Sequence, residues 1–164
     1  MALAALVTWV ITAGLGFFML GTWISNGGTR TDGSAASSFR PPVVFCHFML
    51  AAMGLLVWVV YVIDDSQVLA WVAFVDLVVV AGLGDTLVYR WFKDRQASVA
   101  GETGASALRG GTGGSTGGAR GAVSTRSLTL AEQRIPQVVV VTHGVFAVAT
   151  VVLVLLAALN VGGS

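Results

Sequence analysis

The chain is poor in charge and in cysteine, and both shortages limit what it can be. Only 10% of its 164 residues are charged, whereas a soluble domain is usually about one quarter charged. The single cysteine, Cys46, excludes an internal disulfide, a metal site with paired cysteines and a CxxCH haem attachment. The net charge of +1 comes without a basic stripe bearing aromatic residues, so no nucleic-acid partner is indicated.

What the chain has in excess is apolar sequence. Hydrophobic residues make up 55% of it, and its mean hydropathy is +0.84. A helix needs roughly 20 residues to cross a bilayer, because it rises only about 1.5 Å per residue. Four apolar stretches of the chain reach this length. They cover residues 2–24, 42–63, 68–90 and 136–158. In lipid every backbone polar group must be paired internally, so we expect an all-α integral membrane protein with one four-helix bundle as its single domain.

The basic residues predict how the helices are oriented. All nine lysines and arginines lie in or beside the two long connections, and arginine outnumbers lysine as in GC-rich bacterial genomes. The positive-inside rule therefore predicts that both long connections are cytoplasmic and both termini outside, in the cell inner (plasma) membrane. Residues 97–128 are rich in Gly, Ser and Thr, which predicts a flexible cytoplasmic linker.

Local patterns refine the ends of the helices. Trp23, Tyr89 and Trp91 fit a belt of aromatic residues at the membrane interface. Thr129 and Glu132 have the spacing of a capping box, which predicts a short surface turn before the fourth helix.

The two halves of the sequence resemble each other. Residues 13–16 and 81–84 both read Ala-Gly-Leu-Gly, and Trp23 and Trp91 follow them at the same spacing. An arginine and a proline shortly precede each of the two histidines, His47 and His143. We interpret the chain as a duplicated two-helix hairpin, with both copies crossing the membrane in the same direction.

The two histidines are the main functional candidates, because an ionisable side chain within a membrane span is costly. His47 and His143 and the glycines of the repeated segments are expected roughly 9–15 Å below the cytoplasmic surface. In an up-down bundle the second and fourth helices are diagonal, so the histidines would face each other across the core. Glycines on the other diagonal would clear space between them.

A haem b fits this constellation, because its iron takes two neutral imidazoles, one on each face. The flat ring needs walls without bulky side chains, for which the candidates are Gly14, Gly16, Gly82, Gly84, Ala51, Ala147 and Gly54. Arg40, Arg90 and Arg134 lie at the expected cytoplasmic interface and are candidates for pairing with the propionates.

This layout resembles four-helix b-type cytochromes, such as the membrane anchor subunits of quinone-linked dehydrogenases and the cytochrome b561 group. The resemblance covers the four helices and rests on His47, His143 and the four glycines. It implies a haem held between helices and electron exchange with quinone or a redox subunit in a respiratory chain. Such a protein need not be an enzyme by itself. The apolar segments are also similar to small actinobacterial membrane proteins, which implies no function.

Other interpretations stay open at this point. The histidines can instead form structural hydrogen bonds across helix interfaces, or serve a quinone, proton or metal site without haem. Two imidazoles alone make a poor zinc site, which usually has three or four ligands. For the whole protein the alternatives are a non-catalytic accessory or anchor subunit of a larger membrane complex, and a small transporter.

Two acidic residues of the third stretch are candidates for proton handling. Asp76 lies near the middle of the span, where it could relay protons or hydrogen-bond Thr8 or Thr12. Asp85 lies nearer the cytoplasm and is expected either to orient a histidine through its Nδ1–H or to pair with an interfacial arginine.

Overall fold

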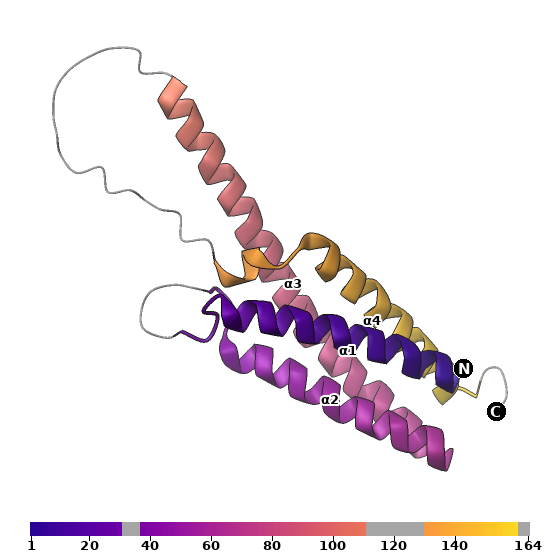
Figure 1. Ribbon diagram of the computed structural model, residues 1–164. Coiled ribbons are helices and arrows are strands. Elements are labelled where there is room, and N and C mark those ends of the chain that lie inside the picture. Colours follow the sequence, from indigo (N-terminus) through magenta and orange to yellow (C-terminus); the bar gives the residue numbers. More distant parts are fainter. Residues whose placement is uncertain (31–36, 111–129, 161–164) are drawn as a thin grey trace, which may run out of the picture.

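All regular secondary structure in the described part of the chain is helical. The computed structural model describes residues 1–30, 37–110 and 130–160, and the side chains of all of these except 101–110. The elements are α1 (Ala2–Ser25), α2 (Pro41–Asp64), α3 (Gln67–Gly110), the 3₁₀ helix η1 (Ala131–Arg134) and α4 (Gln137–Ala158) (Figure 1). All four α-helices are long and apolar enough to span a membrane, which confirms the prediction of an all-α, multi-pass membrane protein.

The four α-helices form a bundle in which neighbours along the chain also pack together. α1 and α3 each pack against both α2 and α4, whereas no close backbone contact joins α1 to α3 or α2 to α4 in the described ranges. α1 and α3 are therefore one diagonal and α2 and α4 the other, as expected. The most extensive interfaces are α1 with α4 and α2 with α3.

Two hydrogen bonds mark one end of the bundle. The indole of Trp58 donates to the carbonyl of Ala2 over 3.3 Å, and the amide of Gln67 donates to the carbonyl of Ala158. The starts of α1 and α3 thus lie beside the ends of α2 and α4 (Figure 1). We call this the turn end, because the short α2–α3 turn lies there, and the opposite end the loop end.

The helix boundaries follow from local backbone chemistry. α2 begins at Pro41, whose fixed φ suits the first helical turn. Its lack of an N–H costs nothing there, because the first N–H groups of a helix have no acceptor within the helix. It ends where Asp65 adopts a left-handed conformation with φ of 52°. α4 likewise begins directly after Pro136, and α1 is followed by Gly27 at φ of 87°. Asp65 thus reverses the chain between α2 and α3, and the prolines and Gly27 mark where the other helices begin or end.

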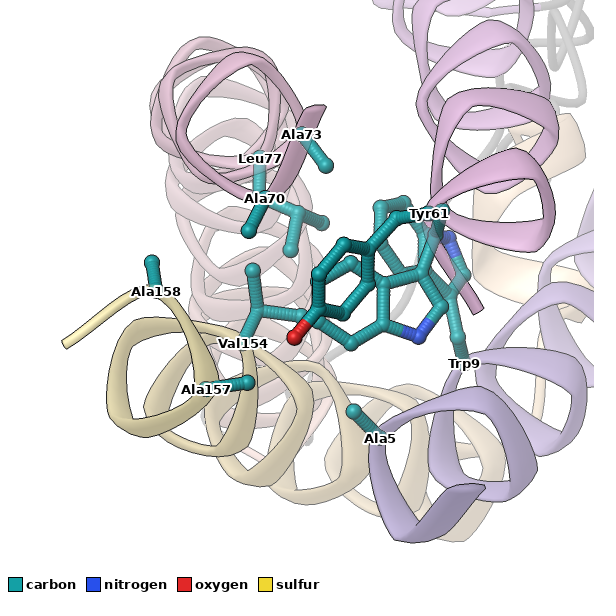
Figure 2. Close-up of a cluster of buried hydrophobic side chains, with 10 residues drawn as sticks. Ala5, Trp9, Tyr61, Ala70, Ala73, Leu77, Val154, Ala157 and Ala158 are labelled. Carbon is teal, nitrogen blue, oxygen red and sulfur yellow. The ribbon is translucent and has the colours of Figure 1, made fainter. Parts of the chain in front are cut away.

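The turn end holds the larger hydrophobic cluster, and aromatic side chains of the first two helices fill it. Trp9 and Trp58 have ring centroids 6.3 Å apart, and Trp58 and Tyr61 4.6 Å apart. In Figure 2 Tyr61 reaches from α2 toward Val154 of α4. The buried members are Ala5, Trp9, Trp58, Tyr61, Ala70, Ala73, Leu77, Val154, Ala157 and Ala158.

The repeat is unequal in this cluster. Leu77, Val154 and Ala157 occupy the positions equivalent to Trp9, Trp58 and Tyr61, at offsets of 68 residues in α3 and 96 in α4. The first hairpin therefore supplies the aromatic bulk, and the second supplies smaller side chains against it.

The loop end differs from two expectations. α3 does not stop near residue 90 but continues to Gly110, so residues 97–110 of the expected linker are helical. The physical reason is that no proline interrupts the segment after Arg90, so the helix continues to pair its own backbone groups. Residues 111–128 of that linker lie outside the described residues.

The tryptophans near this end are not part of an exposed belt. Trp23 and Trp91 are 1% and 2% exposed, whereas Tyr89 is exposed. Trp23 donates through Nε1 to the hydroxyl of Ser37 (2.8 Å), and Trp91 donates to the carbonyl of Glu132 (3.0 Å). Each indole is buried because it ties the end of one hairpin helix to the segment that leads into the next.

The segment before α4 is also more buried than a surface turn. Glu132 in η1 is fully buried, and its Oε1 accepts the backbone N–H of Ser38 over 2.7 Å. Thr129, the expected first residue of the capping box, lies outside the described residues. Glu132 therefore bridges the segments that precede α2 and α4.

The buried indole at the loop end gives a stability prediction. Replacing Trp91→Phe should destabilise the bundle by about 1–3 kcal/mol, because the carbonyl of Glu132 loses its buried donor. The exposed Trp71 provides the control, and Trp71→Phe should stay within about 0.5 kcal/mol of the wild type. Chemical unfolding in detergent micelles measures both, and equal stability of the two variants would contradict the described role of Trp91.

Candidate functional site

The two histidines are held by the same type of hydrogen bond. Nδ1 of His47 on α2 lies 3.0 Å from the carbonyl oxygen of Val80 on α3. Nδ1 of His143 on α4 lies 3.0 Å from the carbonyl oxygen of Thr12 on α1. A carbonyl can only accept, so Nδ1 of each ring carries the proton and the neutral tautomer leaves a lone pair on Nε2.

Each imidazole also lies against a glycine one turn beyond its carbonyl partner. A Cβ built on Gly84 would be 3.2 Å from Cε1 of His47, and one on Gly16 would be 3.4 Å from Cε1 of His143. The carbonyl partner and the glycine are four residues apart on the same helix face, in α3 and in α1 alike. Gly84 and Gly16 therefore let the rings approach the backbone of the neighbouring helix.

The histidines lie in a layer that separates two hydrophobic clusters. On one side is the turn-end cluster, and on the other is a loop-end cluster of Trp23, Ala131 and Ile135. A domain usually has one contiguous core, whereas here small or polar residues interrupt it. The layer consists of Thr12, Gly16, His47, Ala51, Val80, Gly84, His143 and Ala147, none of which belongs to either cluster.

The two histidines come from opposite sides of the bundle. His47 lies on α2 and His143 on the diagonal helix α4, and both side chains are half-buried. In the described part of the chain neither Nε2 atom has a hydrogen-bond partner. The layer therefore contains two imidazole nitrogens that carry no proton and have no partner among the described residues.

The remaining residues expected around the histidines fall into two groups. Ala51 and Ala147 lie one turn after the histidines on their own helices and are half-buried in the layer. Gly14 and Gly82 lie on exposed helix faces, where an added Cβ would meet no atom within 4 Å. The structure therefore does not bring Gly14 and Gly82 to the histidines.

The arginines expected near the propionates are at the loop end. Arg40 and Arg134 are exposed and precede α2 and α4, the two helices that carry the histidines. Arg90 donates to the backbone carbonyl of Ser38 over 3.2 Å. Arg40 and Arg134 thus lie at the loop end, beside the starts of the two helices that carry the histidines.

Neither acidic candidate is hydrogen-bonded to a histidine. Asp85 is exposed and lines a surface pocket with Tyr89, Arg90 and Lys93. The expectation that Asp85 orients a histidine is wrong, because backbone carbonyls already occupy both Nδ1 positions.

Asp76 has a different environment from the one expected. Its Oδ2 is buried without a hydrogen-bond partner in the described ranges, and it packs against Gly54 of α2. The hydroxyl of Thr8 donates to the carbonyl of Ala5, and that of Thr12 donates to the carbonyl of Thr8. Neither threonine therefore forms the expected hydrogen bond with the Asp76 carboxyl. Gly54 therefore accommodates a carboxyl group and is not a wall beside the histidines.

Sequence reasoning missed the residues that Gly54 and Glu132 contact. The repeat aligns Thr8 with Asp76 and Gly54 with Thr150, but it does not show that Asp76 of the second hairpin packs against Gly54 of the first. Glu132 looked like a surface cap, and only the fold shows that its side chain is enclosed.

The described residues offer too few ligand side chains for a metal ion bound by protein groups alone. No group of three or more His, Cys, Asp or Glu side chains lies together in the described part of the chain. A zinc or calcium site made from protein ligands would need more donors than the two imidazoles provide.

Comparisons of the chain with protein-family models, curated proteins and solved structures found no match.

The contact at Gly54 predicts the effect of a single added methyl group. Gly54→Ala should destabilise the bundle by about 1–3 kcal/mol, because its Cβ would overlap the Asp76 carboxyl and approach Cζ2 of Trp9 at 3.1 Å. Gly14→Ala meets no atom within 4 Å and should instead stabilise α1 by about 0.5–1 kcal/mol. Unfolding in detergent compares the two.

A second substitution separates the carboxyl contact from general crowding. In the Asp76→Ala background the cost of Gly54→Ala should fall, because the overlapping group is gone, and the two changes should be strongly non-additive. Strict additivity would contradict the contact between Asp76 and Gly54.

Proposed function

We propose that this protein is a b-type cytochrome-like electron carrier of the membrane. One haem b would be bound between α2 and α4, with Nε2 of His47 and of His143 holding its iron. The observation that carries this proposal is the pair of imidazoles, held alike by opposite helices in a layer where the hydrophobic core is interrupted.

The residues present fit this cofactor. Histidines that bind metals almost always donate their other ring N–H to a carboxylate, carbonyl or water, and here Val80 and Thr12 supply carbonyls. Gly16, Gly84, Ala51 and Ala147 provide the small side chains that a flat macrocycle requires. A bound haem b supplies reversible one-electron transfer at its iron.

The chain itself would orient and tune the site. The carbonyls of Val80 and Thr12 fix each ring about its Cβ–Cγ bond and keep the proton on Nδ1. The hydrophobic clusters on both sides would limit the access of water to the site, which would lower the local dielectric constant and influence the redox potential. Arg40 and Arg134 would pair with the propionates at the loop end. Electrons would be exchanged with quinone or a redox subunit of a respiratory complex, so the chain need not catalyse a reaction alone.

We also propose that the loop end faces the cytoplasm and that both termini are outside, in the inner (plasma) membrane. The described basic side chains support this orientation, because all of them lie at the loop end or in the α3 segment beyond it. The turn end instead carries Asp64 and Asp65. Exposed apolar side chains on all four helices fit contact with a lipid bilayer.

An absorption spectrum tests the cytochrome proposal. Protein purified in detergent from haem-replete cells should show a Soret band when oxidised and sharp α and β bands after reduction with dithionite. His47→Ala and His143→Ala should each abolish these bands, because one imidazole cannot maintain bis-histidine ligation.

The matched control is Gly144→Ala, beside His143, where an added Cβ meets no atom within 4 Å. It should retain the wild-type spectrum. A colourless wild-type protein would overturn the cytochrome proposal and would favour an accessory subunit, for which co-purifying partners should then be sought.

Cysteine labelling tests the proposed orientation. In a Cys46→Ser background, Asp65→Cys at the turn end should react with a membrane-impermeant maleimide added to intact cells. Arg134→Cys at the loop end should react only after the membrane is opened. The reverse pattern would place the loop end outside.

A further inference from the structure

The two large interfaces between the hairpins, α1 with α4 and α2 with α3, differ at one pair of equivalent positions. Between α1 and α4, the hydroxyl of Thr150 donates to the hydroxyl of Thr8 over 2.9 Å. Thr8 in turn donates to the carbonyl of Ala5 over 3.0 Å, so this pair is satisfied. The equivalent positions between α3 and α2 are Asp76 and Gly54, at the same offsets of 68 and 96 residues. A carboxyl group thus faces a glycine between α3 and α2, whereas two hydroxyl groups face each other between α1 and α4.

The carboxyl of Asp76 has apolar surroundings at this point. Its Oδ2 is buried without a hydrogen-bond partner among the described residues. It lies against the backbone of Gly54, and the indole of Trp9 closes the same space. Asp76 as a residue is half-buried, so an ionised carboxylate would have one oxygen enclosed without a donor, which is costly within a membrane span.

The ligand that suits this environment is a proton. A hard cation such as Ca²⁺ takes six to eight oxygen ligands, typically about 2.3–2.6 Å away, whereas Asp76 offers a single carboxyl group. The helices packed around it contribute few titratable groups. α2 carries His47 and Tyr61 along the bundle interior, α4 carries His143, and α1 carries none. Asp85 on α3 itself is exposed nine residues further on.

The carboxyl group is also connected to the histidine layer through α3. Asp76, Val80 and Gly84 recur every four residues on one helix face, and the latter two hold His47. Asp76 is therefore about 6 Å along the helix axis from the residue whose carbonyl fixes the ring. In a medium of low dielectric constant, a change of one charge in the layer would act on this carboxyl more strongly than it would through water.

We propose that Asp76 is the redox-linked proton acceptor of the histidine site, an inference that rests on the proposed function. In the oxidised state the extra positive charge in the layer stabilises the Asp76 carboxylate. When one electron enters the site, that charge is lost and one proton binds to Oδ2, which forms the neutral carboxylic acid. Oxidation releases the electron and the proton together. The Thr8–Thr150 pair holds no such group, so the coupling involves one proton only.

The test is a spectroelectrochemical titration of the haem protein at a series of pH values. If one proton accompanies one electron, the midpoint potential of the wild type should fall by up to about 59 mV per pH unit across part of the range. Asp76→Asn removes the titratable group at nearly constant volume and should make the potential independent of pH in that window. Infrared difference spectra should show a carboxylic acid band upon reduction in the wild type and not in Asp76→Asn.

The other half of the molecule supplies the matched variants. Asp76→Thr places the residue of the equivalent interface at this position without adding bulk beside Trp9, so it should fold, bind haem and lack the pH dependence. Thr8→Ser alters the other interface conservatively and should keep the wild-type dependence.

The outcomes distinguish the two proposals. A colourless protein would overturn the haem proposal together with the redox coupling. A haem protein whose potential is independent of pH, or whose dependence survives in both Asp76 variants, would overturn only the role of Asp76.

Discussion

The hydrogen bond from each histidine to a backbone carbonyl of a neighbouring helix organises the interior of the bundle. A carbonyl within an α-helix has a second lone pair, so Val80 and Thr12 can accept a proton from a ring. This requires the two helix backbones to approach closely, and Gly84 and Gly16 make that approach possible. The largest interfaces, α2 with α3 and α1 with α4, are those that contain this combination.

The position of these hydrogen bonds also explains why the core is divided. Small residues are needed where the rings meet the neighbouring helices, so the bulk of the hydrophobic packing is displaced toward the two ends. At the turn end tryptophan and tyrosine fill the centre, and at the loop end Trp23 and Trp91 anchor the connecting segments. Stability is thus concentrated away from the layer that is proposed to bind the cofactor.

Much of this arrangement could be predicted from the sequence, because a helix that spans lipid must be apolar and of a defined length. Length and apolar composition located the four spans, and the depth of His47 and His143 indicated one shared layer. Periodicity could not distinguish Gly16, which contacts a ring, from Gly14, which faces outward, because both lie in one short motif. The end of α3 was missed because a polar helix in water lacks the apolar pattern that reveals a span. The contact of Asp76 with Gly54 depends on tertiary packing, which no local pattern encodes.

The unequal sharing of aromatic residues has a consequence for how the two halves can assemble. Two copies of the first hairpin would bring two sets of Trp9, Trp58 and Tyr61 into a core that has room for one. Two copies of the second would face each other with Leu77, Val154 and Ala157 and would leave a void. The halves have therefore become complementary and can no longer substitute for one another. A chain cut between them should reassemble only as a heterodimer of unlike hairpins.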